Sequence, residues 1–285
     1  MVATHNFKFI MFKTLHEKGY QIEFVSHALA ILEIDFPDAA AELEEVISNQ
    51  SVPIEEIIGS GGGETKGTQR LRNNLTNKKW LKETFTIKKT INEEPRESIS
   101  HKVDHVRLIE REDGRRFRIA CEIEWNNKDP FFDRDLENFK RLHAEGGISM
   151  GIMITRGTSL QNNMKDLVRR WVDENNVNGF DNLENIGINQ TARQKREVLK
   201  RVQRQKNPIP FREAWTNQFV SDKFGAATTH WRKLEDRITR GVGNPCPLIL
   251  IGMPASIVTF GEDPEVVKQL IEDGAKALEE DEKDS

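Results

Sequence analysis

Long hydrophobic runs are scarce in this 285-residue chain. The longest are PLILIGM and ISMGIMI, which are much shorter than the roughly 20 apolar residues that a helix needs to span a bilayer. The N-terminal segment MVATHNFKFIMFKTLHEKGY has charges scattered through it and lacks the apolar centre of a signal peptide. We therefore expect no membrane segment and a cytoplasmic location.

Cysteine is also scarce, because Cys121 and Cys246 are the only two, and both lie in apolar, strand-like contexts. Buried free thiols are the simplest interpretation, and they suit a reducing compartment. The histidines His101, His105 and His143 lack the spacing to cysteine that a zinc site needs. The composition, with 36% apolar and 31% charged residues, is that of a soluble globular protein.

Positive charge is lacking overall, since the net charge is −4, but it is unevenly distributed. Residues 262–285 hold ten acids and three lysines, a net charge of −7, which leaves +3 for the rest of the chain. A basic stretch between Arg193 and Lys206 holds seven Lys or Arg residues, Lys200 and Arg201 among them, against the single acid Glu197. This stretch is either a clamp on a nucleic-acid backbone or an exposed amphipathic helix, and the pattern leaves both open.

Three regions are expected along the chain. Residues 1–60 form an N-terminal region that is helical at least to about Gln50, residues 61–261 form the core, and residues 262–285 form an acidic tail. Strands are expected at TFTIKKTI, SISHKVDHVRLIE, FRIACEIEW, ISMGIMIT and PLILIGM. Helices are expected at SLQNNMKDLVRRWVDENN and in the basic stretch, and the tryptophans are expected in the core.

Two acids interrupt the strand-like segment FRIACEIEW. With a side-chain period of two, the apolar residues from Phe117 to Trp125 point to the core, and Glu122 and Glu124 share the opposite, non-core face. A carboxylate inside a buried strand costs several kcal/mol unless a cation holds it. Two of them on one strand therefore require an explanation.

The preceding turn determines which residue faces these acids. Residues 112–114 suit a three-residue hairpin loop, a type I turn followed by glycine in the left-handed region. In the resulting register Asp104 lies opposite Glu122, and opposite side chains share a face. A two-residue turn would instead pair Asp104 with Ile123. We therefore predict that Asp104, Glu122 and Glu124 converge at one end of the hairpin.

Carboxylates placed this close together repel one another unless a cation joins them. Hard oxygen ligands with room for water match Mg²⁺, so the cluster predicts a magnesium site. The pattern leaves a second interpretation open, in which the two glutamates form salt bridges with Arg107, Arg116 or Arg118 on a solvated sheet face.

The segment after the acids predicts a crossover. Asp129 and Pro130 suit a helix start, as cap and first-turn residue, and an apolar stripe continues to His143. Gly146 and Gly147 end the helix, and a buried strand follows. Strand, helix and buried strand form a βαβ unit with parallel strands. The predicted fold class is α/β (α+β), a mixed central sheet flanked by helices.

An aspartate on one strand, an acid-x-acid pair on the next, then a helix and a strand resemble the core of the PD-(D/E)xK nucleases. Glu124 takes the place of the usual lysine. The segments SISHKVDHVR, EIEWNNKDPFFDRDLENFKRLH and GIMITRG are more specifically similar to the BglII-like type II restriction endonucleases. The resemblance extends from Gly61 to Pro254; it is weak before Gly61 and absent from the acidic tail.

The resemblance implies a Mg²⁺-dependent, sequence-specific endonuclease that acts on double-stranded DNA as a homodimer and has a cognate DNA methyltransferase as functional companion. Asp104 and Glu122 are then the Mg²⁺ ligands, and Glu124 orients or activates the attacking water. The hairpin is longer than in the type enzyme, which makes Asp113 a rival for Asp104. Because Asp113 lies beside Gly114 in the turn, we keep Asp104.

Further candidates surround these acids. Glu64 opens the helix after GSGGG and is a candidate active-site acid, although a first-turn glutamate also suits the helix dipole. Asn126, Asn127 and Lys128 follow the strand as candidate DNA contacts; turn composition alone explains them equally, but Asn127 matches a family position that contacts DNA.

Arg156 and Thr158, after the buried strand, are weaker recognition candidates. Arg134, Asn138 and Arg141 are expected on a solvated helix face, with contact to DNA or to a partner subunit as the alternative.

Two other functions remain open at this stage. A structure-specific repair or recombination nuclease would share the same core, and it would cut flaps or junctions regardless of sequence. A DNA-binding protein with non-catalytic acids would bind tightly without magnesium-dependent cleavage. Neither is separated from a restriction enzyme by composition.

Overall fold

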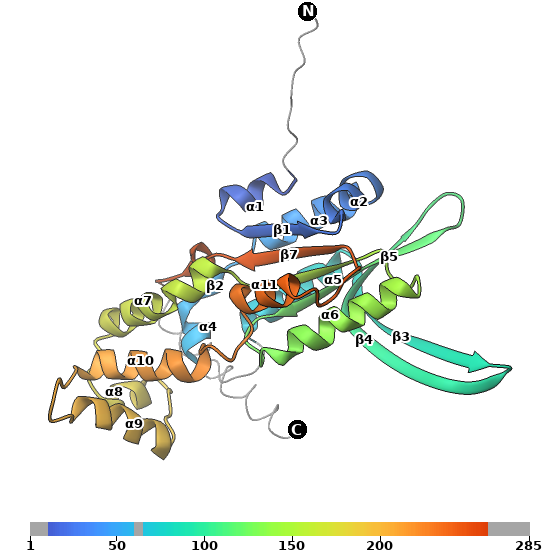
Figure 1. Ribbon diagram of the computed structural model, residues 1–285. Coiled ribbons are helices and arrows are strands. Elements are labelled where there is room, and N and C mark those ends of the chain that lie inside the picture. The colour runs from blue at the N-terminus through green and yellow to red at the C-terminus, as the bar shows by residue number, and fades with distance from the viewer. Residues whose placement is uncertain (1–10, 60–64, 262–285) are drawn as a thin grey trace, which may run out of the picture.

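The structure is a computed structural model that describes residues 11–59 and 65–261. In this part of the chain the central element is a six-stranded sheet with the order β1-β7-β6-β5-β4-β3 (Figure 1). Strands β5, β6 and β7 are parallel, whereas β3, β4 and β1 are paired antiparallel to their neighbours. A mixed sheet flanked by helices confirms the predicted fold class, including the parallel strands of the βαβ unit.

The strands are β1 (Gln21–Val25), β2 (Val52–Pro53), β3 (Trp80–Ile91), β4 (Glu94–Glu110), β5 (Arg116–Glu124), β6 (Met150–Arg156), β7 (Leu248–Met253) and β8 (Val258–Thr259), and β2 pairs with β8 in a separate small sheet. The helices are α1 (Lys13–Glu17), α2 (Ala28–Asp35), α3 (Pro37–Ser48), α4 (Ile54–Gly59), α5 (Lys66–Asn77), α6 (Pro130–Ala144), α7 (Thr158–Glu174), α8 (Phe180–Asn185), α9 (Ala192–Val202), α10 (Phe211–Lys223) and α11 (Trp231–Thr239). A short 3-10 turn covers Ala255–Ile257.

Both faces of the sheet are covered, so the expectation of a non-core face on β5 is wrong. Successive side chains of β7 point to opposite faces of the sheet, and both sets are buried. Ile249 and Ile251 belong to one core cluster, and Leu248 and Leu250 belong to the other. Ala120, on the same face as the two glutamates, is fully buried in the second cluster. Helices α6 and α11 provide the cover on that side (Figure 1).

The N-terminal region is only partly helical. Helices α1, α2 and α3 agree with the expectation, but Gln21–Val25 forms strand β1, which pairs antiparallel with β7 at the edge of the main sheet. Isolated apolar segments this short cannot be assigned to helix or strand from periodicity alone. Residues 21–25 form a strand because they pair with β7, which is far away in the sequence.

Helix α6 begins at Pro130 as predicted, but Asp129 does not cap it. Its side chain makes no capping hydrogen bond. The Asp129 carboxylate is 3.1 Å from Lys233 Nζ and 3.5 Å from Arg237 Nη2, both on α11. The residue therefore links two helices instead of satisfying the first turn of its own.

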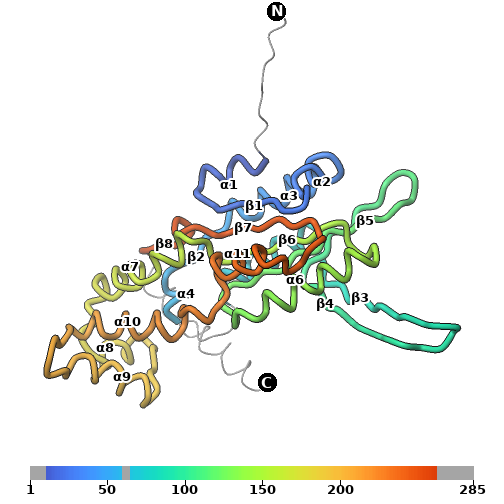
Figure 2. Tube along the Cα trace, viewed as in Figure 1, coloured from blue at the N-terminus to red at the C-terminus, as the bar shows by residue number. Residues whose placement is uncertain are grey.

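A helical lobe extends from one end of the sheet (Figure 2). It consists of α8, α9, α10 and the adjoining part of α7, with α10 packed against both α7 and α9. Trp171 and Trp215 are packed together in it, with ring centroids 6.5 Å apart. All five tryptophans are buried, as predicted. The two cysteines are also buried and free.

The described residues contain no helix that is long and apolar enough to cross a membrane.

The packing of α6 on β6 provides a test of this architecture. A Cβ added to Gly151 would lie 2.5 Å from Cδ2 of Phe139, well inside normal contact distance. We expect Gly151→Ala to lower the free energy of unfolding by about 1–3 kcal/mol, because overpacking displaces the ring. Urea denaturation measures this change. Gly179→Ala, where an added Cβ has no atom within 4 Å, should cost under about 1 kcal/mol; equal losses would contradict the described packing.

Candidate active site

The hairpin turn between β4 and β5 forms as the sequence predicts. Gly114 has a φ of +79°, in the left-handed region. Its N–H donates to the carbonyl oxygen of Arg111 at 2.9 Å, and the N–H of Arg111 donates to the carbonyl oxygen of Arg115 at 3.0 Å. The Asp113 carboxylate accepts from Arg115 Nε at 2.7 Å. Asp113 therefore belongs to the turn and not to the acid cluster.

The predicted register of this hairpin is confirmed. Strand pairing continues to His105, which lies opposite Cys121. One step further, the backbone N–H of Asp104 donates to Oε1 of Glu122 at 3.3 Å. At the position where the regular strand pairing ends, the side chain of Glu122 thus accepts the hydrogen bond from the backbone N–H of Asp104.

A β-bulge explains why the ladder ends at this point. The pairing of β3 with β4 shifts between Leu81 and Glu83, so that Asp104 and His105 together lie opposite one residue of β3. Bulges bend a strand and re-aim its side chains, and they are common beside active sites. This bulge places Asp104 at the end of the hairpin next to Glu122.

A cleft of about 430 Å³ lies beside these residues. It is lined by Ser100, His101, Lys102 and Asp104 of β4, Glu122 of β5, and Arg134 and Asn138 of α6. Asp104 and Glu122 therefore meet in one cleft. Arg134 is exposed, as expected for a solvated helix face, and Asn138 is half-buried; both line the cleft from α6.

The two glutamates of β5 are buried beside it. Glu122 is 6% exposed and Glu124 is 3% exposed. Burial raises the pKa of Glu122 well above its ordinary range, and the charges of Asp135 and Asp104 raise it further. Burial also raises the pKa of Glu124, to about 8, with Asp135 as the next cause.

Asp135 on α6 is an acid of this cluster that the sequence analysis missed. It is 2% exposed. Its Oδ1 accepts from Arg134 Nε at 2.7 Å, whereas its buried Oδ2 has no hydrogen-bond partner among the described residues. The signal was available, because Asp135 follows Phe132 by three residues and precedes Phe139 by four. An acid at that spacing lies within the apolar stripe of the helix.

The arginines named by the salt-bridge interpretation pair with other acids. The contacts are Arg107 with Glu42 at 2.8 Å, Arg116 with Glu110 at 3.6 Å, and Arg118 with Glu83 at 3.0 Å.

The cations that do approach the cluster come from other elements. Arg134 Nη2 is 3.6 Å from Oε1 of Glu124. Asp104, at the rim, pairs with Arg72 at 3.0 Å and with Lys82 at 3.2 Å. The buried glutamates are thus less well compensated than the aspartate at the rim.

The donor chemistry fits a hard divalent cation. Asp104, Glu122, Glu124 and Asp135 offer carboxylate oxygens, which such ions prefer. Burial and neighbouring acids raise the pKa of Glu122 and of Glu124, and a bound cation would offset both effects. As the side chains stand, no three His, Cys, Asp or Glu residues within the described ranges converge closely enough to hold an ion.

The loop after β5 is fixed by hydrogen bonds to a distant segment. The N–H of Asn127 donates to Thr229 Oγ1 at 3.1 Å, and the N–H of Thr229 donates to the carbonyl oxygen of Asn127 at 2.8 Å. The side chain of Asn127 donates to Oε2 of Glu124 at 2.7 Å. Lys128 is exposed, whereas the Oδ1 of Asn126 is buried without a hydrogen-bond partner in the described chain.

Arg156 anchors the fold and cannot reach DNA, so its prediction as a DNA contact is wrong. The residue is fully buried. Its guanidinium donates to the carbonyl oxygen of Trp125 at 2.8 Å, to Thr228 Oγ1 at 2.6 Å and to the carbonyl oxygen of Thr229 at 2.7 Å. A position directly after a buried strand did not distinguish a buried arginine from an exposed one.

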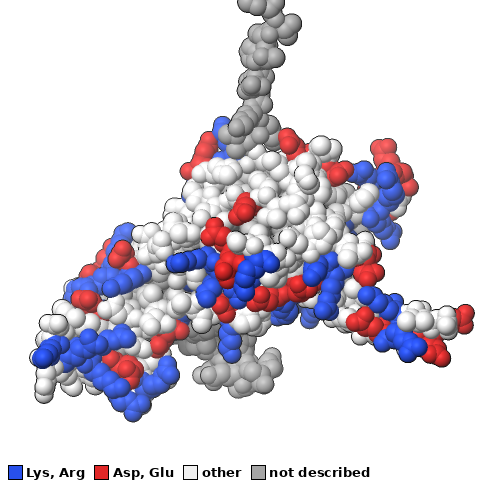
Figure 3. All heavy atoms as spheres, in the orientation of Figure 1, with Lys and Arg blue, Asp and Glu red and all other residues white. Residues whose placement is uncertain are grey.

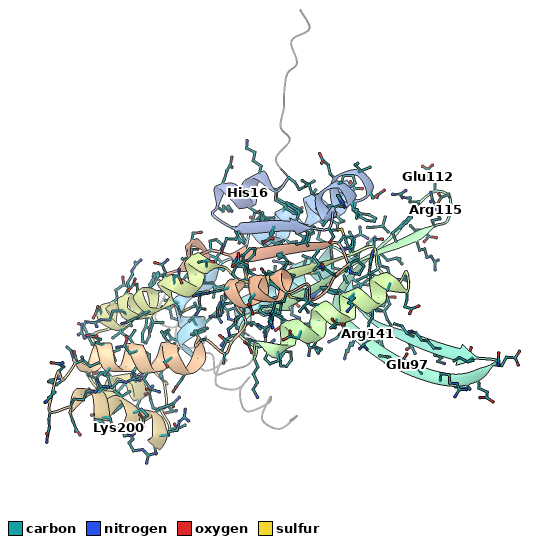
Figure 4. All side chains as sticks on the ribbon, viewed as in Figure 1. His16, Glu97, Glu112, Arg115, Arg141 and Lys200 are labelled. Carbon is teal, nitrogen blue, oxygen red and sulfur yellow. The ribbon has the colours of Figure 1, made fainter. Side chains whose placement is uncertain are left out.

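The other predicted residues lie farther from the acids. Thr158 is exposed at the start of α7, and its N–H donates to the Gln21 side chain. Lys200 is exposed on α9 and pairs with Glu197 at 2.6 Å. Figure 4 shows it on the helical lobe, where Figure 3 shows Lys and Arg side chains gathered. Arg201 is partly buried, with a buried Nη1 that has no partner within the described residues. Glu64 falls outside the described residues.

The raised pKa of Glu124 predicts how stability depends on pH without divalent cations. The unfolded carboxyl releases its proton near its ordinary value of 4.5, but the folded one retains it to about 8, so stability should fall as pH rises through this window. Glu124→Gln removes part of this loss. Its unfolding temperature, measured by calorimetry with a chelator, should therefore exceed the wild-type value more at about pH 8 than at about pH 5.

Glu110→Gln is the matched control, because Glu110 is an exposed acid on the same hairpin. It should shift the unfolding temperature by the same small amount at both pH values. An equal shift for Glu124→Gln at the two pH values would contradict a raised pKa.

Comparison with known proteins adds a family to this geometry. The sequence model of the restriction endonuclease BglII/BglIII family matches residues 20–253. The match includes the cleft and every strand from β1 to β7, and it begins well before Gly61, where the resemblance seen in the sequence was weak. No curated protein matched the chain. The chain belongs to the BglII family of restriction endonucleases, and it is accordingly a type II site-specific deoxyribonuclease that binds double-stranded DNA.

Proposed function

We propose that this endonuclease cleaves a specific double-stranded DNA sequence in a Mg²⁺-dependent reaction, with the cleft between β4, β5 and α6 as its active site. The observation that carries the proposal is the meeting of Asp104 and Glu122 in one cleft. Buried Glu124 and Asp135 adjoin it. Buried acids with so little compensation are costly, and such costs are typical of functional sites.

Asp104 and Glu122 would hold the metal ion. When bound, Mg²⁺ supplies positive charge for the phosphate and lowers the pKa of a coordinated water. The burial of Glu122, which accepts one long hydrogen bond from the Asp104 N–H, and the unpartnered Oδ2 of Asp135 among the described residues support a cation at this position.

Glu124 is proposed to orient the attacking water and to accept its proton. A general base must be held within hydrogen-bond reach of its target, with a pKa near the operating pH. Asn127 holds Oε2 of Glu124 at 2.7 Å, and the pKa of Glu124 lies near 8. The involvement of Glu64 remains a proposal from sequence alone.

DNA contacts are proposed for the loop after β5. Asparagine and lysine can contact base edges and phosphates in a groove, and the backbone of Asn127 is tied to Thr229 beside the acids. In this structure the Asn127 side chain donates its hydrogen bond to Glu124. Asn126 and Lys128 are the other residues of the loop that we propose to contact bases or phosphates. Thr158 is a weaker candidate at the same edge of the sheet.

A homodimer is proposed as the cleaving form, since two-fold symmetry presents one active site to each strand of a palindromic sequence. A cognate DNA methyltransferase is the proposed functional companion.

The catalytic assignment is tested with Asp104→Asn, Glu122→Gln and Glu124→Gln. Each should lower the cleavage rate by about 10²–10⁴-fold, because it removes an ionisable carboxyl group, and should leave DNA binding without metal largely intact, because it keeps the shape of the side chain. The measurement is digestion of unmethylated phage DNA with and without Mg²⁺, followed by sequencing of the ends.

Asp113→Asn is the control for this series and should cleave like the wild type, because Asp113 is bound to Arg115 in the turn. Cleavage retained by all three active-site variants would refute the assignment. Cutting at flaps or junctions regardless of sequence would favour a repair nuclease, and tight binding without any cleavage would favour a non-catalytic DNA-binding protein.

The basic stretch on α9 is tested by reversing charge. If Lys200 clamps the DNA backbone, Lys200→Glu combined with Arg201→Glu should reduce affinity and lower the salt dependence by about 0.9 per lost phosphate contact. Anisotropy titrations of a labelled duplex over a range of salt concentrations measure both quantities. Lys13→Glu, on α1 away from the lobe (Figure 1), is the control. An unchanged salt slope would leave α9 as a solvated helix.

A further inference from the structure

Strands β3 and β4 continue beyond the sheet as a two-stranded ribbon (Figures 1 and 2). Pairing of β4 with β5 ends at His105. Pairing of β4 with β3 continues from Val103, opposite Glu83, to Glu94, opposite Ile91. A two-stranded ribbon is marginally stable in water by itself. An exposed element of this length therefore suggests a contact surface.

One face of the ribbon rests on the body of the protein near its base. Phe85 and Ile87 pack against the core cluster that α6 covers. Lys89 is 3.3 Å from Glu145 at the end of α6, and it is 3.7 Å from Glu97 across the ribbon. Figure 4 labels Glu97 on this ribbon. This face is therefore already partnered.

The opposite face carries only hydroxyl and lysine side chains along its regular portion. Because side chains alternate along a strand, the residues on this face are adjacent across the ribbon. They form three cross-strand pairs, Thr84 with Lys102, Thr86 with Ser100, and Lys88 with Ser98. All six are exposed, and among the described residues none of their side chains has a hydrogen bond or ion pair. The face has no acid.

This hydroxyl–lysine face begins at the active-site cleft. Ser100 and Lys102 line the cleft together with Asp104, Glu122 and His101, which lies opposite Phe85 on the partnered face. The cleft therefore adjoins the edge of β4, where both faces of the ribbon reach it. From Lys102 to Ser98 the face extends for about 13 Å, at roughly 3.3 Å per residue. That length matches about four nucleotides of one strand, at 3.4 Å per nucleotide along the duplex axis. Because Ser100 and Lys102 line the cleft, a DNA backbone held in the cleft would pass beside the start of this face, and a duplex is too stiff to bend away over so short a distance.

We propose that the hydroxyl–lysine face of the β3–β4 ribbon contacts the DNA phosphate backbone adjacent to the cleaved bond. Lysine, serine and threonine side chains are common phosphate contacts, and a face without acids does not repel DNA. A second copy of the chain fits this face poorly, since the centre of a protein interface is typically apolar and poor in lysine and serine. The inference rests on the proposed function to the extent that DNA occupies the cleft.

The experiment compares Lys88→Ala/Lys102→Ala with Lys89→Ala, which removes a lysine from the partnered face of the same ribbon. Binding to a fluorescein-labelled duplex of mixed sequence is measured by anisotropy without divalent cations, over a range of salt concentrations. The double variant should lower the salt slope by about 1.8, or 0.9 for each phosphate contact, and weaken binding at least ~10-fold at 0.1 M salt. Lys89→Ala should retain the wild-type slope. Thermal unfolding confirms that both variants are folded.

An unchanged slope in the double variant would overturn the inference, and so would equal losses in the two variants. A loss of dimer mass in sedimentation with unchanged DNA binding would overturn it in favour of a second copy on this face. Failure of the proposed catalytic site is distinguished from failure of this inference. The catalytic site is tested by cleavage, whereas these binding titrations are made without divalent cations and do not depend on the catalytic carboxyl groups. Absence of DNA binding by the wild type would overturn both proposals.

Discussion

Repulsion among four carboxyl groups is the constraint on which this structure depends. Asp104, Glu122, Glu124 and Asp135 meet where β4, β5 and α6 adjoin, and three of the four are buried. Protons on the raised-pKa groups and the nearby Arg134 relieve the repulsion only in part. The apolar core on the same face must therefore hold together acids that would separate in water. If these acids form the active site as proposed, activity and stability are opposed at this point of the fold.

Much of the hairpin could be predicted because local rules decide it. The type of a hairpin turn determines its register, and the turn ending at Gly114 places Asp104 beside Glu122 without any knowledge of the remaining chain. The buried strand β6 and the crossover helix α6 were also evident, since their patterns of apolar residues are regular. Alternation correctly put the two glutamates on one face of β5.

The unpredicted features all depend on contacts between distant segments. Alternation does not show whether a face is solvated, because that depends on where α6 returns to cover it. The bulge at Asp104 arises from the pairing with β3. Arg156 is buried because residues 228 and 229, more than 70 positions later, supply its hydrogen-bond partners. Asp135 was overlooked because the helical stripe was judged by its apolar members.

The attachment of the loop after β5 to Thr229 has an evolutionary consequence. These ties are made mainly through the main chain at Asn127 and Thr229, so they persist when neighbouring side chains are exchanged. Residues 126 and 128 can accordingly be substituted while the backbone of the loop next to the acids keeps its position. If these positions contact bases as proposed, a lineage that exchanges them would change its target sequence and keep the same arrangement of acids.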